Sequence, residues 1–334
     1  MKIAICNRPG SFSDRWIEYC KNHEIDYKIV DVYASDIVEQ VKDCDAFMWH
    51  HHHADYRDAL FAKQLLYSLE TAGIKCFPDS KTTWHFDDKL GQKYLLEAIG
   101  APLVPSYVFY TKKEALNWIN TTSFPKVFKL RSGAGAANVK LVKTASEAKK
   151  LVNKAFGKGF SQFDRLGYLK EKFNKWRLGK ENFKGLLKGV AHLFFSPLFA
   201  RMHSPEKGYV YFQDFIENNT FDLRVVVVGN KALGEKRLCR EGDFRASGSE
   251  KFEYVNIRED VLQIAFSVAM RLNLQSVAFD FIFNNDRPLV VEMSYGFGFK
   301  GLSHCHGYYT SDFQWHPEPD ADFCGWMVEN LIRK

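Results

Sequence analysis

The stretch Val277–Ser294 reads VAFDFIFNNDRPLVVEMS, and its pattern predicts a β-hairpin. Two runs rich in β-branched and aromatic residues flank the turn formers at 284–286, a combination typical of hairpins. We place the loop at residues 285–287. This loop gives an apolar face on which Phe279, Phe281 and Phe283 lie opposite Met293, Val291 and Leu289. Because a shift by one residue would mix polar and apolar side chains on each face, the pattern favours this register.

The other face of the predicted hairpin carries two carboxylates. Asp280 lies directly opposite Glu292, and Ala278 lies opposite Ser294. Like charges directly opposite each other destabilise a strand pair, so a cation between them is expected. Carboxylate oxygens in an incomplete cage suit Mg²⁺, whose other ligands are commonly water and substrate phosphates. Two alternatives stay open: both side chains point to solvent, or a lysine or arginine bridges them.

A second segment of interest surrounds Lys129, near the end of a predicted strand over 126–130. The loop that follows, residues 131–138, reads RSGAGAAN and contains Gly133 and Gly135. Small residues let backbone N–H groups approach phosphate oxygens closely, and a lysine adds positive charge. The loop lacks the G-K-[ST] sequence of a Walker loop. A phosphate-binding loop and an ordinary hairpin connection are both open from these residues alone.

The first part of the chain alternates strand and helix patterns. Strands are predicted over 2–6, 25–32 and 46–49, and Ser13 or Asp14 is the expected cap of the helix after the first strand. Such alternation predicts a small, mainly parallel α/β domain. The pattern breaks near residues 77–79.

The remaining elements predict α+β lobes. The expected elements are a helix over 87–99, a strand over 106–110, a helix over 112–120, strands over 126–130 and 138–142, mostly strands over 209–294 with a helix near 261–272, and a final helix over 323–332. From about 156 to 205, lysines and arginines far outnumber acids and alternate with Phe, Trp and Leu. This segment fits a basic helical insertion packed on the main body, or a docking surface for an anionic partner or membrane face.

The bulk composition sets broad limits. The chain has 334 residues, 46% of them hydrophobic, which allows two or three domains with large cores. It has no apolar run long enough for a membrane span and no signal-peptide pattern at its start. Seven cysteines without a C-x-x-C pair favour reduced thiols and a cytoplasmic location. A net charge of +6 is compatible with a polyanionic small ligand, and nucleic acid is not an expected partner.

In order along the chain, these segments resemble the ATP-grasp superfamily, which includes glutathione synthetase, D-alanine–D-alanine ligase and ribosomal-protein glutamate ligases. The similar segments are DDKLGQKYLLEAIGAPLVPSYVFY, FPKVFKLRSGAGAANV, YVYFQDFIENNTFDLRVVVVGNKALGEKR, REGDFRASGS and FDFIFNNDRPLVVEMS. The resemblance implies an α/β and α+β fold in which two α+β lobes clamp ATP. It also implies three domains: a Rossmann-like preATP-grasp domain over 1–84, a central lobe over 85–210 that contains the basic insertion, and a C-terminal lobe over 211–334.

The resemblance also implies roles for particular residues. The residues expected at ATP are Lys89, Lys129, Gly133, Gly135, Gln213, Asp214, Phe215, Ile216 and Asp222. Arg237 and Arg245 are the expected catalytic residues, serving the transferring phosphoryl group; the alternatives are a surface strand position for Arg237 and a loop salt bridge for Arg245. Asp280, Glu292 and Ser294 would hold two Mg²⁺ ions, with Mn²⁺ as an alternative metal. The family usually has Asn where this chain has Ser294, which leaves the second metal position less well defined.

The function that the resemblance implies is an ATP-dependent carboxylate–amine ligase that forms an amide through an acyl phosphate and releases ADP. The substrates would be a small-molecule or sugar carboxylate and an amine, in the manner of bacterial ATP-grasp proteins associated with surface-polysaccharide synthesis. A small-molecule kinase and a non-catalytic docking protein that uses the basic insertion are the alternatives. Peripheral membrane association through 156–205 and a homodimer are compatible with the sequence.

Four consecutive histidines, His50–His53, follow the predicted strand over 46–49. In open α/β sheets, ligands bind outside the carboxyl ends of strands, so some of these histidines are expected in the acceptor-substrate pocket. A polar loop and a second metal site are the alternatives. Ser303 and His304, beyond the hairpin, are expected to approach the same cleft.

Overall fold

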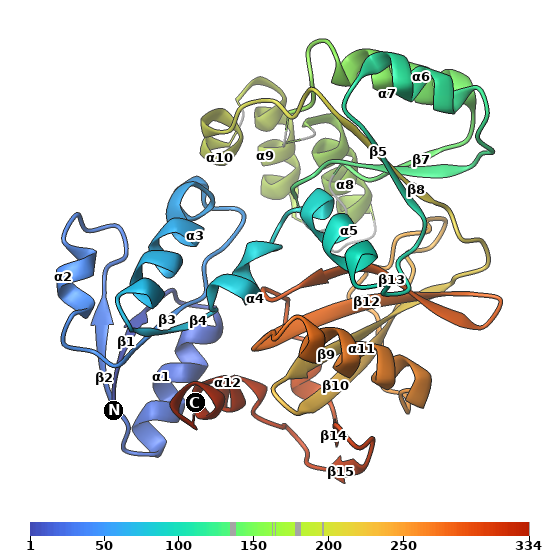
Figure 1. Ribbon diagram of the computed structural model, residues 1–334. Helices are drawn as coiled ribbons and strands as arrows, with labels where there is room; N and C mark the ends of the chain where they lie inside the picture. Colours follow the sequence, from blue (N-terminus) through green and yellow to red (C-terminus); the bar gives the residue numbers. More distant parts are fainter. Residues whose placement is uncertain (134–137, 162, 164, 178–181, 196, 334) are drawn as a thin grey trace.

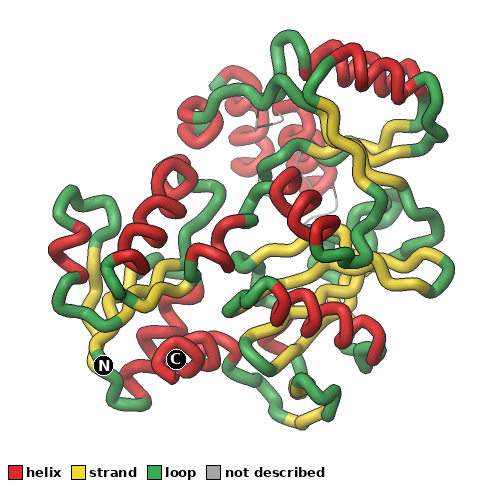
Figure 2. The backbone as a smooth tube through the Cα atoms, viewed as in Figure 1, coloured by secondary structure: helices red, strands yellow, loops and turns green. Residues whose placement is uncertain are grey.

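The computed structural model describes residues 1–133, 138–161, 163, 165–177, 182–195 and 197–333. Figure 1 shows the described elements arranged around three sheets, and Figure 2 shows how strands and helices alternate along the backbone.

The N-terminal sheet is parallel, with strand order β2-β1-β3-β4. Its strands are β1 (Lys2–Cys6), β2 (Asp26–Val30), β3 (Ala46–Trp49) and β4 (Lys75–Phe77). The helices of this part are α1 (Phe12–Asn22), α2 (Ile37–Val41), α3 (Tyr56–Thr71) and α4 (Ser80–Trp84). Helix α1 is capped by Ser11, whose side chain accepts from the Ser13 N–H, so neither of the expected caps, Ser13 or Asp14, is the cap.

A small antiparallel sheet with order β5-β8-β6-β7 forms the centre of the second part. Its strands are β5 (Ser106–Phe109), β6 (Lys126–Lys129), β7 (Lys140–Val142) and β8 (Val210–Asp214), and its flanking helices are α6 (Lys112–Ile119) and α7 (Ala145–Ala155). Apolar side chains of α6 and α7, among them Ile119 and Val152, pack with Phe128 and Phe212 of the sheet. This packing covers one face and leaves the other for the cleft described below.

The large sheet has the order β13-β12-β9-β10-β14-β15, with β11 paired to β10. Its strands are β9 (Phe221–Val228), β10 (Lys231–Leu238), β11 (Phe252–Glu253), β12 (Ser276–Asn284), β13 (Arg287–Ser294), β14 (Gly307–Thr310) and β15 (Trp315–Pro317). Helices α5 (Lys89–Ala98) and α11 (Glu259–Arg271) contribute to the core on one face, and the short helix η1 spans Leu302–His304. Successive side chains of β9 point to opposite faces of this sheet, as in any strand.

The last helix, α12 (Phe323–Arg333), packs against α1 and β4 of the N-terminal part, beside α1 in Figure 1. Trp326 shares a buried cluster with Trp16, and the Tyr19 hydroxyl donates to Glu329 at 2.9 Å. The division at residues 84 and 210 stays a proposal. Helix α12, at the end of the proposed C-terminal lobe, packs on the proposed N-terminal domain.

The predicted hairpin is present, but its register shifts part-way along. Asp280 lies opposite Glu292 and Ala278 opposite Ser294, as expected. The turn is the two-residue pair Asn285-Asp286, both with positive φ, whereas a three-residue loop including Arg287 was expected. Near the turn the pairing is shifted by one residue, so Phe281 lies opposite Val290 and not Val291. An irregularity between Asp280 and Phe281 restores the expected pairing from Asp280 onward. Val291 is the extra residue, and it faces the cleft.

The described part of the basic segment contains the helices α8 (Arg165–Arg177), α9 (Phe183–Phe194) and α10 (Leu198–Met202). Helix α8 packs on α9, where Gly189 lies against Leu169 and Lys172. Phe183, Leu187 and Val190 of α9 remain exposed. Among the described residues, no helix is both long and apolar enough to cross a membrane.

Candidate active site

A cleft lies between the open face of the small sheet and the large sheet. One part of its lining is apolar, formed by Val127, Phe215, Ile216, Phe244, Ile282 and Val291. The other part is charged, formed by Lys89, Lys129, Asp222, Arg237, Arg245, Asp280 and Glu292. The structure therefore brings together most of the residues expected at ATP, although they come from five separate segments of the chain.

Lys89 is placed by the start of helix α5. Asp88 caps this helix by accepting from the N–H groups of residues 90 and 91. The Lys89 Nζ donates to the carbonyl of Gly133 at 2.8 Å and lies 3.7 Å from Glu292 Oε2. The Gly133 N–H donates to Asp87 at 2.7 Å, so the beginning of the Gly-rich loop is fixed to the start of α5. Gly135 lies outside the described residues.

Lys129 lies at the end of β6 and is almost fully buried. Its Nζ donates to the Gln213 side-chain oxygen at 2.7 Å. Burial lowers the pKa of Lys129 to about 8, with Glu292 acting in the opposite direction. A lysine with this pKa is charged at neutral pH but close to losing its proton. A phosphate nearby would hold the proton on it.

The segment Gln213–Ile216 runs along the cleft at the end of β8. The Gln213 amide nitrogen lies 3.4 Å from the Val291 carbonyl, which links the two sheets, and Asp214 accepts from Lys126 at 2.5 Å. Phe215 packs edge-on against Phe244, with ring centroids 5.6 Å apart. The apolar side chains that line this part of the cleft suit a flat ring such as a purine, since concave apolar pockets with few polar groups are typical of cofactor sites.

Four charged side chains, Asp222, Arg224, Arg237 and Asp280, form what we call the cleft cluster. The strand register explains it: Asp280 of β12 lies opposite Arg224 of β9, and Asp222 of β9 lies opposite Arg237 of β10. Arg224 donates to both oxygens of Asp280, at 2.8 and 3.0 Å, and Arg237 donates to both oxygens of Asp222, at 2.6 and 2.7 Å. Arg237 Nη2 also lies 2.7 Å from Asp280.

Arg237 and Asp280 of the cleft cluster are buried, and Asp222 and Arg224 are partly buried. The pKa values of the two carboxyl groups follow from burial and pairing. Burial raises the pKa of Asp222 to about 6, helped by the charge of Asp280 and opposed by Arg237. Burial acts the same way on Asp280, but Arg224 and Arg237 hold the pKa of that carboxyl well below its usual range. Asp280 is therefore ionised at neutral pH. The alternative from the sequence was a lysine or arginine that bridges Asp280 and Glu292. Two arginines pair with Asp280 instead, and Glu292 is contacted by Lys89 at 3.7 Å.

Glu292 differs from its cross-strand partner. Its side chain is 37% exposed, and the contact to Lys89 is at 3.7 Å. Carboxylate oxygens that line a cleft are hard ligands of the kind that Mg²⁺ takes. Among the described residues, no three His, Cys, Asp or Glu side chains converge as a protein-only metal cage. Glu292 and Asp280 thus fit a metal that phosphate oxygens and water would complete, provided that an arginine yields an oxygen of Asp280.

The other expected metal and catalytic residues are engaged locally. Ser294 donates its hydroxyl to the carbonyl of Gly296 at 2.7 Å and is not part of the cleft lining. Arg245 lines the cleft and also pairs with Asp243 of its own loop, with contacts of 2.6–3.0 Å. The loop salt bridge that was the alternative for Arg245 is therefore present, together with the expected position at the cleft.

The four histidines divide into two pairs. His50 and His51 are buried: His50 stacks on Phe12 at 3.9 Å, and His51 contacts Thr83 Oγ1 at 2.6 Å. The Tyr295 hydroxyl donates to the His51 carbonyl at 2.8 Å. This pair joins the N-terminal sheet to the segment after β13.

His52 and His53 are partly exposed, with ring centroids 4.2 Å apart. Burial lowers the pKa of each to about 4. For His53 the nearby charges are those of Lys89, which lowers the pKa further, and Glu292, which raises it. His53 is thus near the end of the cleft that carries Lys89 and Glu292. Ser303 donates to the Phe299 carbonyl, and neither it nor the exposed His304 lines the cleft.

Arg224, which pairs with Asp280, and Val291, which lines the cleft, are among the residues of the site that were not predicted from the sequence. Arg224 follows Asp222 by two residues in an otherwise apolar strand, FDLRVVVV, so the pair shares one face of β9. This alternation could have predicted from the sequence that Arg224 lies beside Asp222. Val291 reaches the cleft only because of the irregularity in β13, for which the sequence offers no clear mark.

Comparisons with known proteins support the fold. Residues 201–309 match the model of the RimK-like ATP-grasp domain. A probable alpha-L-glutamate ligase from Legionella pneumophila (strain Corby) is 31% identical over 108 residues, which is 31% of this chain. The match spans 34% of the length of that relative.

Two solved structures resemble the chain over nearly its whole length. One is a RimK domain protein ATP-grasp from Sphaerobacter thermophilus, with a TM-score of 0.61 and 15% identity, covering 99% of this chain and 100% of the other. The second is the biotin carboxylase domain of the Hydrogenobacter thermophilus 2-oxoglutarate carboxylase in complex with MgADP, ADP and bicarbonate, with a TM-score of 0.61 and 14% identity. It covers 100% of this chain and 70% of the other. The chain therefore has the ATP-grasp fold, as its motifs predicted.

Proposed function

We propose that this ATP-grasp protein is an ATP-dependent carboxylate–amine ligase. The observation that carries the proposal is the cleft, in which an apolar slot adjoins Lys89, Lys129, Arg237 and Arg245 around the Asp280/Glu292 pair. The slot suits adenine, and the charged end suits a polyphosphate. The similarity to a probable alpha-L-glutamate ligase supports ligation over other uses of ATP.

In the proposed reaction, an oxygen of the substrate carboxylate attacks the γ-phosphorus of ATP. The bond from that phosphorus to the bridging oxygen breaks, and ADP leaves. An amine then attacks the acyl carbon, phosphate departs with the electron pair, and the nitrogen loses a proton. The products are an amide, ADP and phosphate. The work of the protein is to position the groups and to neutralise charge on the phosphates.

The residues of the cleft divide this work. Lys89 and Lys129 supply charge from the small-sheet side, and Lys89 also fixes the Gly-rich loop through Gly133. Arg237 and Arg245 can each hold two oxygens in a planar fork, which a lysine cannot do. Asp280 and Glu292 would hold Mg²⁺, with Mn²⁺ as an alternative, and a bound metal would screen negative charge between phosphate oxygens. A second ion would need Ser294 to turn from Gly296.

The test is ADP release from Mg·ATP against a panel of amino acids, uronic acids and other carboxylates, with and without amines. We expect release that requires both a carboxylate and an amine and is lost in Asp280→Asn. Uronic acids would fit a role in surface-polysaccharide synthesis. Release with hydroxyl compounds alone would identify the kinase alternative. A protein that binds no ATP would contradict the proposal.

The helices α8–α10 offer a second, separate proposal. Helix α9 exposes Phe183, Leu187 and Val190 on the same helix as the exposed Lys184 and Lys188. A helix of this kind can lie on an anionic lipid surface. Co-sedimentation with vesicles that contain phosphatidylserine, and not with phosphatidylcholine vesicles, is the expected result. No binding to either would contradict it.

A further inference from the structure

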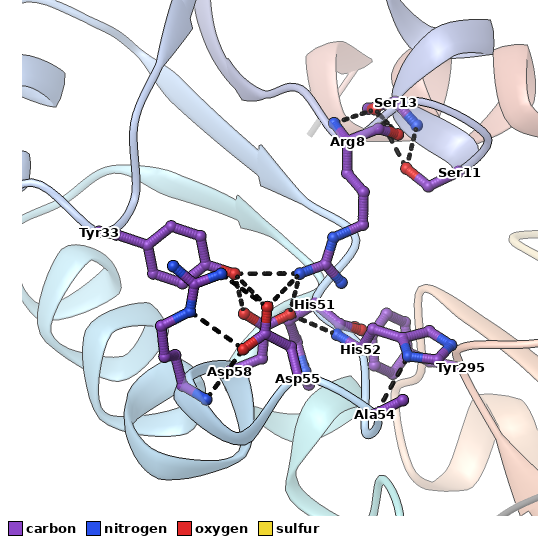
Figure 3. A network of polar contacts seen from close by, with 11 residues as sticks. Arg8, Ser11, Ser13, Tyr33, His51, His52, Ala54, Asp55, Asp58 and Tyr295 are labelled. Carbon is purple, nitrogen blue, oxygen red and sulfur yellow. Dashed lines mark hydrogen bonds and ion pairs between the residues drawn. The ribbon is translucent and has the colours of Figure 1, made fainter. Parts of the chain in front are cut away.

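A network of polar side chains lies at the carboxyl ends of β1, β2 and β3 (Figure 3). We call it the Arg8 cluster; it consists of Arg8, Tyr33, Asp55, Arg57 and Asp58. Arg8 follows β1, Tyr33 follows β2, and the other three follow β3 at the start of α3. With the strand order β2-β1-β3-β4, the chain winds in opposite directions from β1, and the crevice between β1 and β3 is a topological switch point. Ligands of open α/β sheets bind at such points.

The buried carboxylate of Asp58 holds the Arg8 cluster together. It is 1% exposed and accepts from Arg8 Nη2 at 2.8 Å, from the Tyr33 hydroxyl at 2.5 Å and from the His52 N–H at 2.7 Å. Arg8 Nη2 is also 3.0 Å from the Tyr33 oxygen and 3.4 Å from Asp55. The backbone of Arg8 is fixed as well, because its N–H donates to Ser13 Oγ at 2.9 Å. The guanidinium group is therefore held in place through a single nitrogen.

The rest of the Arg8 guanidinium is available. Among the described residues, Nε and Nη1 of Arg8 have no hydrogen-bond partner, although the side chain is only 28% exposed. Figure 3 shows the bonded nitrogen on the side of Tyr33 and the others on the side away from it. Arg57 contrasts with this arrangement. Its Nε and Nη2 both bond Asp55, and its guanidinium lies 3.6 Å from the centre of the Tyr33 ring.

A series of contacts leads from the Arg8 cluster toward the ATP cleft: the His52 N–H donates to Asp58 at 2.7 Å, and the ring centroids of His52 and His53 are 4.2 Å apart. The charge of Arg8 lowers the pKa of His52, and that of Lys89 lowers the pKa of His53. Both rings are neutral at neutral pH, with pKa values of about 4 caused mainly by burial. The His52 Nδ1 accepts from the Ala54 N–H at 3.0 Å, which leaves its Nε2 to carry the proton. The carboxylates of Asp58 and Asp87 also act on His52, and that of Glu292 acts on His53, so the two neutral rings lie between charges of both signs.

We propose that Arg8 binds a substrate carboxylate other than the one that reacts, so that the substrate lies along His52 and His53 with its reacting group toward Lys89 and Glu292. The inference rests on the proposed function and adds a recognition element: at least one substrate is an amino acid or similar molecule with a free carboxylate. The Arg8–Asp58 pair is neutral overall, so recognition comes from directed N–H groups rather than from a broad positive field.

The test compares acids with their carboxamides. The binding of common L-amino acids and dipeptides, and of the matching carboxamides, is measured by calorimetry on the full chain with Mg²⁺ and a non-hydrolysable ATP analogue. We expect at least one acid to bind about 10- to 100-fold more tightly than its carboxamide, the size of a hydrogen bond to a charged group. Arg8→Lys should remove most of that difference, and Arg57→Lys, the matched control, should retain it.

Each other outcome has a distinct meaning. If the protein binds the ATP analogue but discriminates no acid from its amide, or if Arg8→Lys discriminates as well as the unchanged protein, the inference about Arg8 is wrong and the proposed ligase stands. If the analogue does not bind at all, the proposed function fails first. Thermal unfolding of Arg8→Lys and Arg8→Gln checks that the variants are folded. The comparison of acid with amide in the unchanged protein needs no variant.

Discussion

The cleft cluster and the Arg8 cluster are both built around arginine–aspartate pairs, and they present opposite groups to a ligand. In the cleft cluster, the residue expected to bind a metal is Asp280, and two arginines already occupy its oxygens. In the Arg8 cluster, the residue expected to bind substrate is the arginine, and a buried aspartate holds it by one nitrogen only. Asp280 must therefore release an arginine before it can bind a metal, whereas Arg8 needs no change of partner to bind a carboxylate.

The contrast has an energetic consequence. A buried ion pair gains little net stability, but removal of one partner is costly, since it leaves a buried charge alone. Asp280 is therefore important for the free protein as well as for the metal, and a metal must compete with Arg224 and Arg237 for it. The predictions below test this difference, starting from the largest expected effect.

The largest effect concerns Asp280 and Glu292 in the free protein. Asp280→Asn should lower the free energy of unfolding by about 3 kcal/mol, because Arg224 and Arg237 lose their buried counter-charge. Glu292→Gln removes the same charge from a side chain that is 37% exposed and should cost less than about 1 kcal/mol. Urea denaturation of both variants measures the difference. Equal losses of unfolding free energy in the two variants would contradict this difference between the two carboxylates.

Arg245 should affect turnover and not nucleotide binding. Its fork faces the cleft beside Asp243, and lysine cannot hold two oxygens in the same geometry. Arg245→Lys is expected to lower kcat about 10- to 100-fold, in line with a hydrogen bond between charged groups, and to leave the ATP dissociation constant nearly unchanged. Arg240→Lys, in the same loop, is the control. Full activity of Arg245→Lys would remove Arg245 from the mechanism.

The pH dependence of ATP binding should report Lys129. Burial places the pKa of Lys129 near 8, so above this pH the free protein loses a positive charge that ATP needs. The dissociation constant should then rise by up to about tenfold for each pH unit above 8. Lys129→Arg should flatten this dependence. The same group affects stability with the opposite sign: the unfolded chain keeps this proton up to about 10.5, so the contribution of Lys129 to stability increases between pH 8 and 10.5.

A pH-independent affinity in the unchanged protein would contradict the position of Lys129 at the phosphates. Calorimetric titrations in buffers of different ionisation enthalpy give a second measure, because ATP binding near pH 8 should take up a proton.

The smallest effect is expected at Ser294. Its hydroxyl is committed to the Gly296 carbonyl, so Ser294→Ala should cost about 1 kcal/mol of stability, the usual contribution of one hydrogen bond. The Mg²⁺ concentration needed for half-maximal activity should not change. A clear increase in that concentration would show that Ser294 turns toward a metal during the reaction.

Much of the fold could be predicted from local patterns. The strands over 2–6 and 46–49 have the expected bounds, and the helix expected over 87–99 spans Lys89–Ala98. The pairing of Asp280 with Glu292 was also predicted, because the alternation of apolar side chains restricts the register. The register nearer the turn was missed, since a two-residue turn followed by one extra residue gives the same parity as a three-residue loop.

The electrostatics of the site could not be predicted in the same way. That Asp280 meets Arg224 depends on β12 lying beside β9, a pairing between segments far apart in sequence. The burial of His50 and His51 depends on Tyr295 and the segment after β13 closing over them. The places of Lys89, Lys129 and Asp222 in the cleft were predictable from motif order, but the partner of each was set by the tertiary fold.

The central claim is that the Asp280/Glu292 end of the cleft holds the metal that accompanies ATP. Its most direct test is the affinity for ATP with and without Mg²⁺, in the unchanged protein and in Asp280→Asn, by calorimetry. We predict that Mg²⁺ tightens ATP binding in the unchanged protein and has little effect in the variant. An equal effect of Mg²⁺ in both proteins, or no ATP binding in either, would contradict the account.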